Sequence, residues 1–158
     1  MLKAIPLVLA LLAIPHTLSA WGCDGHRSVA FVAWKLLAHN ATARQHITDL
    51  IAQLSAPTTG CKALDDVPAI VNASTWADAK RTNETAPWHF IDVPIKSDVA
   101  ADAESHFCAA GCVTQKIRTF RDKLAASPDT VDGEQARALA FLIHFAGDVH
   151  QPDRKSVV

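Results

Sequence analysis

The sequence has 158 residues, of which 49% are apolar and 20% are charged, and its 15 Lys and Arg against 16 Asp and Glu give a formal net charge of −1. This length is sufficient for one domain with a buried core, and the balanced charge excludes the basic surface by which many proteins attract nucleic acid. That exclusion applies only to the protein alone, because several bound divalent cations would outweigh the net charge and make a site electropositive.

The first twenty residues have the pattern of a secretory signal peptide. Lys3 supplies the positive charge, residues 4–14 form an apolar run, and Ala20 is a small residue suited to cleavage. A retained anchor is the alternative, but the run is short and interrupted by proline, and no later stretch is long and apolar enough to span a bilayer. We therefore expect a signal peptide at 1–20, a domain over 21–158, a secreted or secretory-pathway location and no membrane partner.

The apolar periodicity of the remaining chain is helical. It predicts helices from Val29 to Leu37, from Ile47 to Leu54, from about Asp65 to Lys80, from Val113 to Leu124, and from Asp132 to Asp148. An irregular segment from Thr82 to Gly111 separates the third helix from the fourth, and it shows no sustained alternation typical of a strand. The predicted fold class is mainly α, with functional residues contributed by several helices and one loop.

All four cysteines follow the predicted signal peptide. An even number in a secreted chain favours two disulfides. Cys108 and Cys112 are close enough to bridge locally, which leaves Cys23 to pair with Cys61. A cysteine-rich zinc site is the alternative, but a single Cys-x-x-x-Cys pair is a weak signal for one, and an oxidising compartment disfavours it.

Three sequons also fit a secreted protein. They are Asn40-Ala41-Thr42, Asn72-Ala73-Ser74 and Asn83-Glu84-Thr85. In a eukaryotic source such sequons can carry N-glycans, so we expect a glycoprotein. The sequence alone does not distinguish the sequons that are used.

The last predicted helix carries two metal-ligand residue types, His144 and Asp148, in a largely apolar stretch. A spacing of four places an imidazole and a carboxylate on one face of a helix, one turn apart. A buried helix has little reason to carry both groups unless they are paired or bind a metal. The alternative is a core histidine that is hydrogen-bonded to Asp148.

Four further candidates lie at separated positions. Signal cleavage would make Trp21 the N-terminus, so that its amine and carbonyl could chelate a cation with His26 as a third donor. Asp78 lies shortly before Arg81, a residue that can grip a phosphate, and His89 lies in an apolar surrounding. Each residue has a structural alternative, such as a surface ion pair for Asp78. The complete set is Trp21, His26, Asp78, His89, His144 and Asp148.

A ligand set of nitrogen and oxygen donors without thiolates suits zinc, and several carboxylates suit a zinc cluster. Zinc provides hydroxide near neutral pH and stabilises charge that develops on a phosphate. The predicted chemistry is therefore metal-assisted hydrolysis.

Five segments together resemble the class I zinc-dependent nucleases of fungi, plants and protists. The segments are Trp21-Gly22-x-x-Gly25-His26, Trp76-Ala77-Asp78-x-x-Arg81, Trp88-His89-Phe90-Ile91-Asp92, Cys108 to Gly111-Cys112-Val113, and His144-Phe145-Ala146-Gly147-Asp148-x-x-Gln151-Pro152. The order and approximate spacing of all five segments match the family pattern, and this joint match is more specific than any single segment. The resemblance runs from Trp21 to Pro152 and covers roughly the first half of a full-length member.

The resemblance implies a helical bundle of the phospholipase C and zinc nuclease type with three zinc ions. It further implies a secreted endonuclease and 3'-nucleotidase that cleaves phosphodiester bonds of single-stranded RNA and DNA. One zinc would take Asp78, His89, His144 and Asp148. Another would take the amine and carbonyl of Trp21 together with His26, and Asp148 would bridge the two ions.

The same resemblance implies roles for the residues that face the substrate. Asp78 would help to orient the attacking water, and Arg81 would stabilise the transition-state phosphate. Phe90 would stack on a base, and Asp92 would accept a hydrogen bond from the edge of that base.

The sequence departs from the family pattern after Pro152. Members continue with an apolar residue and a zinc-binding histidine, whereas this chain has Asp153 and Arg154 and stops at Val158. We therefore expect a C-terminally truncated domain with at most two zinc ions, impaired activity, and self-association through the core that the missing half would cover. The alternatives are a zinc phospholipase C-like phosphodiesterase and an inactive secreted helical fragment.

Overall fold

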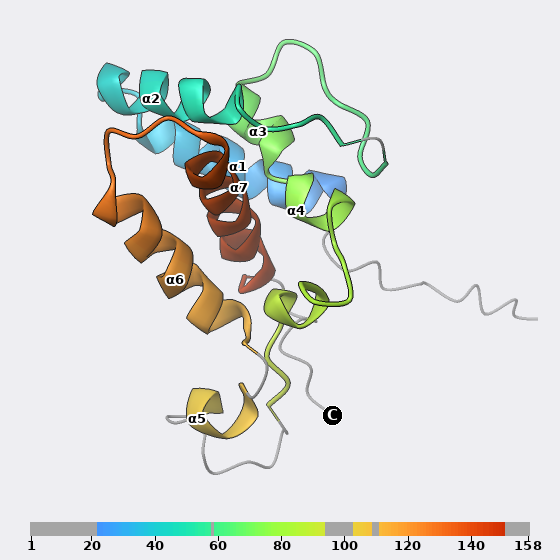
Figure 1. The fold of residues 1–158 in the computed structure, drawn as a ribbon. Coiled ribbons are helices and arrows are strands. Elements are labelled where there is room, and N and C mark those ends of the chain that lie inside the picture. Colours follow the sequence, from blue (N-terminus) through green and yellow to red (C-terminus); the bar gives the residue numbers. More distant parts are fainter. Residues whose placement is uncertain (1–21, 58, 94–102, 109–110, 151–158) are drawn as a thin grey trace, which may run out of the picture.

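The structure is a computed structural model that describes residues 22–57, 59–93, 103–108 and 111–150. Across these ranges the regular secondary structure is helical and contains no strand, which confirms the predicted mainly α fold (Figure 1). The predicted signal peptide, Trp21 and the tail from Gln151 lie outside the described residues. The elements are α1 (Cys23–Leu36), α2 (Ala41–Ile51), α3 (Ala69–Ala73), α4 (Trp76–Ala79), the 3-10 helix η1 (Ala86–His89), α5 (Ala103–Phe107), α6 (Val113–Ala126) and α7 (Gly133–Asp148).

The single third helix that the periodicity predicted is wrong, because α3 and α4 are separated by Ser74 and Thr75. The Ser74 hydroxyl donates to the carbonyl of Val71 at 2.7 Å, and the Thr75 hydroxyl donates to the carbonyl of Asn72 at 3.1 Å. Hydroxyl side chains that bond the preceding turn compete with the helical backbone pattern. Asp78 therefore lies on α4, a separate short helix that follows the break.

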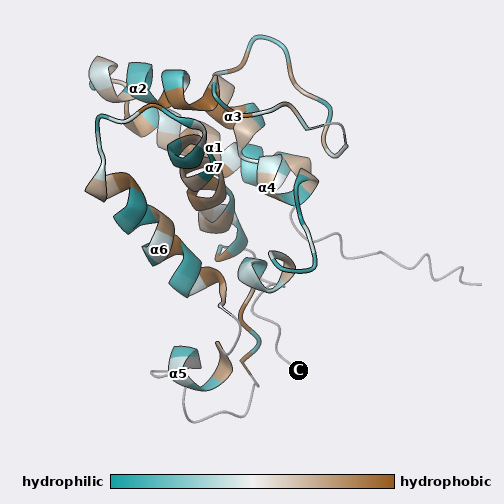
Figure 2. Ribbon diagram, viewed as in Figure 1, coloured by the Kyte–Doolittle hydropathy of each residue, from teal (hydrophilic) through white to brown (hydrophobic). Residues whose placement is uncertain are grey.

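Helix α7 is the central element of the bundle and contacts α1, α2, α3, α4 and α6 (Figure 1). It begins at Gly133 because the Asp132 carboxylate accepts hydrogen bonds from two backbone N–H groups of the first turn, at 2.8 and 2.7 Å. Figure 2 shows the middle of α7 mostly in hydrophobic colours, whereas α6 alternates between hydrophilic and hydrophobic bands. Such alternation is expected of a helix with one buried face.

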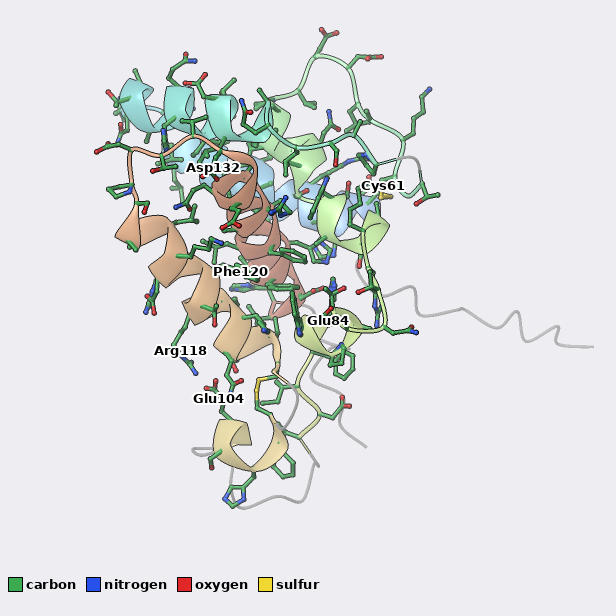
Figure 3. All side chains as sticks on the ribbon, in the orientation of Figure 1. Cys61, Glu84, Glu104, Arg118, Phe120 and Asp132 are labelled. Atoms are coloured by element: carbon green, nitrogen blue, oxygen red, sulfur yellow. A yellow bond between two sulfur atoms is a disulfide. The ribbon has the colours of Figure 1, made fainter. Side chains whose placement is uncertain are left out.

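The core around α7 is aromatic. Phe141 and Phe145 on α7 pack with Trp76 of α4 and Val113 of α6 in one buried cluster. Phe120 points from α6 toward α7, and its ring stacks on Phe141 with centroids 5.0 Å apart (Figure 3). This packing fixes α7 against both α4 and α6.

Two disulfides, Cys23–Cys61 and Cys108–Cys112, are present, so the predicted pairing is confirmed. The first attaches the loop after α2 to the first turn of α1, beside the labelled Cys61 in Figure 3. The second closes the segment between α5 and α6. None of the helices in the described part of the chain is long and apolar enough to cross a membrane.

Candidate metal centre

Five of the six predicted metal ligands converge at one place, where α1, α4, η1 and α7 meet (Figure 1). The sixth, Trp21, lies outside the described residues. His26, His89, His144 and Asp148 are each at most 1% exposed, whereas the side chain of Asp78 is 38% exposed. Asp78 therefore marks the open side of an otherwise buried cluster.

Four donor atoms form the inner part of this cluster. His144 Nε2 lies 3.1 Å from His89 Nδ1, 3.3 Å from Asp148 Oδ2 and 3.4 Å from Asp78 Oδ1. His89 Nδ1 lies 3.0 Å from Asp148 Oδ2 and 3.7 Å from Asp78 Oδ1. Tetrahedral zinc with its usual bond lengths places its ligand atoms about 3.3 to 3.6 Å apart. These five separations lie near that range, so the donors are close enough to share one metal ion.

The ring of His144 is oriented by the break between α3 and α4. Its Nδ1 lies 2.7 Å from the carbonyl oxygen of Ser74, and because a carbonyl only accepts, Nδ1 carries the hydrogen. The neutral ring then presents the lone pair of Nε2 to the cluster, as is usual for a metal-binding histidine held by an outer carbonyl.

The carboxylates of the cluster attract positive charge. Burial lowers the pKa of His144, but hydrogen bonds to Asp148 and Asp78 and the charges of both outweigh burial and raise that pKa to about 9. Burial raises the pKa of Asp78, yet the hydrogen bond and positive charge of His144, together with His89 and His26, hold it below its usual value. In the absence of a metal this site therefore binds a proton tightly, and a cation would compete for the same position.

A second position adjoins the first on the side of α1. His26 Nε2 lies 3.7 Å from Asp148 Oδ1 and 3.9 Å from Asp78 Oδ2. Each carboxylate thus faces His26 with one oxygen and faces the other two histidines with its second oxygen. Carboxylates with that arrangement can bridge two neighbouring cations.

Gly147 allows His26 to reach this position, and sequence reasoning did not identify its role. The His26 ring stacks on His144 with centroids 3.9 Å apart. A Cβ at residue 147 would lie 2.5 Å from His26 Nδ1, so no larger residue fits there without displacement of the ring. The available signal was an isolated glycine inside a helical pattern, which often marks a close approach.

Phe90 and Asp92 lie apart from the metal ligands, on a small cavity of about 210 Å³. Phe107 of α5 lines the same cavity, together with Pro87, Ile91, Gly111 and Cys112. The backbone of Phe90 is tied to α6, because its carbonyl accepts from the Val113 N–H at 3.3 Å. Phe107 was not among the residues predicted from the sequence, where its only signal was an aromatic side chain directly before a disulfide-bonded cysteine.

Arg81 follows the end of α4 and is exposed. Its backbone N–H donates to the carbonyl of Asp78 at 3.3 Å, so Arg81 belongs to the turn that carries this ligand. Within the described part of the chain its guanidinium makes no ion pair with Asp78. It is therefore positioned beside the open side of the cluster rather than inside it.

Comparison with known proteins gives a consistent result. The family model described as S1/P1 Nuclease matches residues 21–153. Nuclease S1 of Aspergillus oryzae is 28% identical over 157 residues, which cover 95% of this chain and 49% of that protein. Nuclease P1 of Penicillium citrinum and Nuclease PA3 of Penicillium sp are each 29% identical over 140 residues, covering 84% of this chain and 46% of each relative. The chain therefore spans about half the length of these relatives, and no solved structure is significantly similar to it.

Proposed function

The chain belongs to the S1/P1 nuclease family, and from that premise we propose that it is a zinc-dependent nuclease acting on single-stranded RNA and DNA. The observation that carries the proposal is a set of four donor atoms, from α4, η1 and α7, in which five of the pairs are 3.0 to 3.7 Å apart. Those separations and the nitrogen and oxygen chemistry of the donors suit zinc.

The proposed zinc positions follow from the two sides of the cluster. One ion would be held by Asp78, His89, His144 and Asp148. The other would be held by His26 with the amine and carbonyl of Trp21, and Asp148 would bridge the pair. Because Asp153 and Arg154 occupy the positions of an apolar residue and a histidine ligand in the family pattern, we propose at most two zinc ions rather than three.

When bound, zinc would supply hydroxide near neutral pH and stabilise charge on the phosphate. The exposed carboxylate of Asp78 would accept a hydrogen bond from the attacking water and so help to orient it. Arg81, on the same turn, can donate two hydrogen bonds to phosphate oxygens as negative charge develops there. These two roles need only groups on the open side of the cluster.

The cavity lined by Phe90 and Asp92 supports a preference for single strands. A base inserted there would stack on Phe90 and present its edge to the carboxylate of Asp92. A base inside a duplex cannot enter such a cavity unless it is first unpaired and unstacked. Single-stranded RNA, single-stranded DNA and nucleotides are therefore the proposed substrates.

Secretion and self-association belong to the same proposal. The two disulfides suit an oxidising compartment, in agreement with a signal peptide at 1–20. Helix α1 exposes three large apolar side chains, Phe31, Val32 and Leu36, with Leu36 81% exposed. An exposed apolar face of this kind favours association with another chain.

The test uses the chain from Trp21 onward, refolded with zinc. We expect release of acid-soluble nucleotides from single-stranded DNA and RNA but not from duplexes, and loss of this activity with a chelator. Asp148→Asn should lose bound zinc and activity, whereas Asp129→Asn, an exposed carboxylate on the loop before α7, should keep both.

Two outcomes would contradict the proposal. Full zinc content in Asp148→Asn would refute the metal site. Release of diacylglycerol from choline lipids without release of nucleotides would assign the zinc site to a phospholipase C-like phosphodiesterase instead.

A further inference from the structure

The three sequons differ in their surroundings. At Asn72 the side-chain carboxamide is already engaged in hydrogen bonds to the backbone. Its side-chain oxygen accepts from the backbone N–H of Leu64 at 2.9 Å, and its Nδ2 donates to the carbonyl of the same residue at 2.9 Å. The third residue of this sequon, Ser74, is fully buried. Asn72 therefore acts as a two-bond clamp on the loop that follows α2.

Several neighbouring contacts fix the same loop to the bundle. The Cys23–Cys61 disulfide attaches it to α1, and the Arg27 guanidinium donates to the carbonyl of Lys62. At its beginning, the indole N–H of Trp76 donates to the carbonyl of Ser55 at 3.0 Å. The Asn72 clamp is thus one part of a continuous set of attachments, and its loss would free the end of the loop that leads into α3.

An N-linked sugar at Asn72 is incompatible with this clamp. Glycosylation converts the side-chain carboxamide into a secondary amide, and secondary amides strongly prefer the trans form. In the trans form the sugar carbon lies on the same side of the C–N bond as Oδ1. That is the side of the hydrogen donated to Leu64, so the sugar would replace the hydrogen and collide with the loop.

Asn83 is placed differently. It is exposed in the turn between α4 and η1. Thr82 and Thr85 hold this turn through reciprocal hydrogen bonds, in which each backbone N–H donates to the hydroxyl of the other residue, at 2.9 and 3.2 Å. The turn does not depend on the side chain of Asn83, so a sugar can be added there without loss of a structural contact.

Asn40 is also compatible with a sugar, although its side chain has a structural role. It precedes α2, and its Oδ1 accepts from the N–H of Ala43 at 2.9 Å as a helix cap. Glycosylation substitutes Nδ2 and leaves Oδ1 as an acceptor. Because Asn40 and Thr42 are both exposed, the sugar would extend into solvent while the cap remains.

We propose that Asn40 and Asn83 are N-glycosylation sites of this protein, and that the folded secreted chain carries no glycan at Asn72. The inference rests on the proposed secretion of the chain from a eukaryotic cell. The donor is an oligosaccharide linked to a lipid diphosphate. A bond forms between Nδ2 and the sugar C1 as the bond between C1 and the diphosphate oxygen breaks, the lipid diphosphate leaves, and the amide gives up a proton.

The test expresses residues 21–158 in yeast behind a yeast secretion leader, so that the result does not depend on residues 1–20 or on nuclease activity. The secreted protein is treated with peptide N-glycosidase in heavy-oxygen water, and each sequon peptide is examined by mass spectrometry. We expect complete or major labelling at Asn40 and Asn83 and none at Asn72. Asn40→Gln and Asn83→Gln should each remove one glycan from the secreted chain, whereas Asn72→Gln should remove none.

The pool retained inside the cell separates a sequon that is never modified from one whose modification blocks folding. Glycan at Asn72 confined to the retained pool supports the proposal, as does its complete absence. Glycan at Asn72 in the secreted, disulfide-bonded protein overturns the assignment of that sequon. An unmodified Asn40 or Asn83 in the secreted protein overturns the assignment of that residue, while the proposed zinc site is left unaffected.

Discussion

Replacement of Gly147 by alanine tests whether the backbone of α7 sets the position of His26. The added Cβ would lie 2.5 Å from Nδ1 and 3.2 Å from Cε1 of the His26 ring. Since the optimal separation of non-bonded heavy atoms is about 3.5 Å or more, the His26 ring must move away by roughly 1 Å. This movement increases the distance between His26 Nε2 and Asp148 Oδ1, which is 3.7 Å in the unsubstituted protein.

The expected effects differ between the two metal positions. Insertion of a methyl group into a packed contact costs about 1 to 3 kcal/mol, and the gain from alanine over glycine inside a helix offsets only about 0.5 to 1 kcal/mol of this. A metal site tolerates ligand displacements of about 0.2 Å, so the position at His26 should lose its ion. The donors at His89 and His144 do not contact residue 147 in this way and should keep theirs.

Zinc analysis after dialysis and urea unfolding in chelator measure the two effects. We expect bound zinc to fall from two ions per chain to one, and the zinc-free protein to lose up to about 2.5 kcal/mol of unfolding free energy. Gly133→Ala is the matched control, because its Cβ would make only an ordinary contact, 3.8 Å from Arg137 Nη1, at the start of the same helix. That control should keep its zinc and gain about 0.4 to 1 kcal/mol. Equal zinc content and stability in the two variants would refute a positioning role for Gly147.

Three further predictions follow from single contacts. In zinc-free protein the pKa of His144 is about 9, against 6.5 in the unfolded chain, so protonation of His144 stabilises the folded state fully below pH 6.5. This stabilisation, up to about 3 kcal/mol, is lost as the pH rises through 9. Equal stability to urea at pH 6 and pH 9.5 would contradict this prediction. Phe90→Ala and Phe107→Ala should each raise KM for a dinucleotide about fivefold or more with little change in kcat, because a stacked base contributes about 1 to 3 kcal/mol; an unchanged KM in Phe107→Ala would exclude that residue from the base cavity. Asn72→Ala removes two hydrogen bonds to the loop and should cost about 1 to 3 kcal/mol in urea unfolding, whereas Asn83→Ala, in the exposed turn, should stay within about 0.5 kcal/mol of the parent.

Local features of the fold could be predicted from the sequence because they depend on residues close together in the chain. The helical period located α6 and α7, and Asp132 marked the start of α7 as a capping residue. The four-residue spacing of His144 and Asp148 placed both on one helix face, as the structure has them, 3.3 Å apart. The pairing of cysteines followed from their number and from one short spacing.

Contacts between distant segments were decided only by the tertiary structure. Apolar period alone does not reveal that Ser74 and Thr75 break the third helix, or that the Ser74 carbonyl orients His144 across seventy residues of chain. That Phe107 lines the same cavity as Phe90 depends likewise on the arrangement of segments separated in the chain, which no local pattern encodes.

The sequence by itself determined the local features of this protein. These are helices with one apolar face, two disulfides, and histidines and carboxylates in the order of a nuclease family. Only the packing of α1, α4, η1 and α7 decided that the His26 ring lies against Gly147, which has no side chain, and stacks on His144. The tertiary structure likewise decided that the amide of Asn72, on α3, is hydrogen-bonded to Leu64 of the loop, although its sequon differs from the exposed Asn40-Ala41-Thr42 only in having serine at the third position. The physical reason is that propensity and periodicity act over one or two turns, whereas donor separations of 3 to 4 Å between elements depend on the complete set of helix contacts.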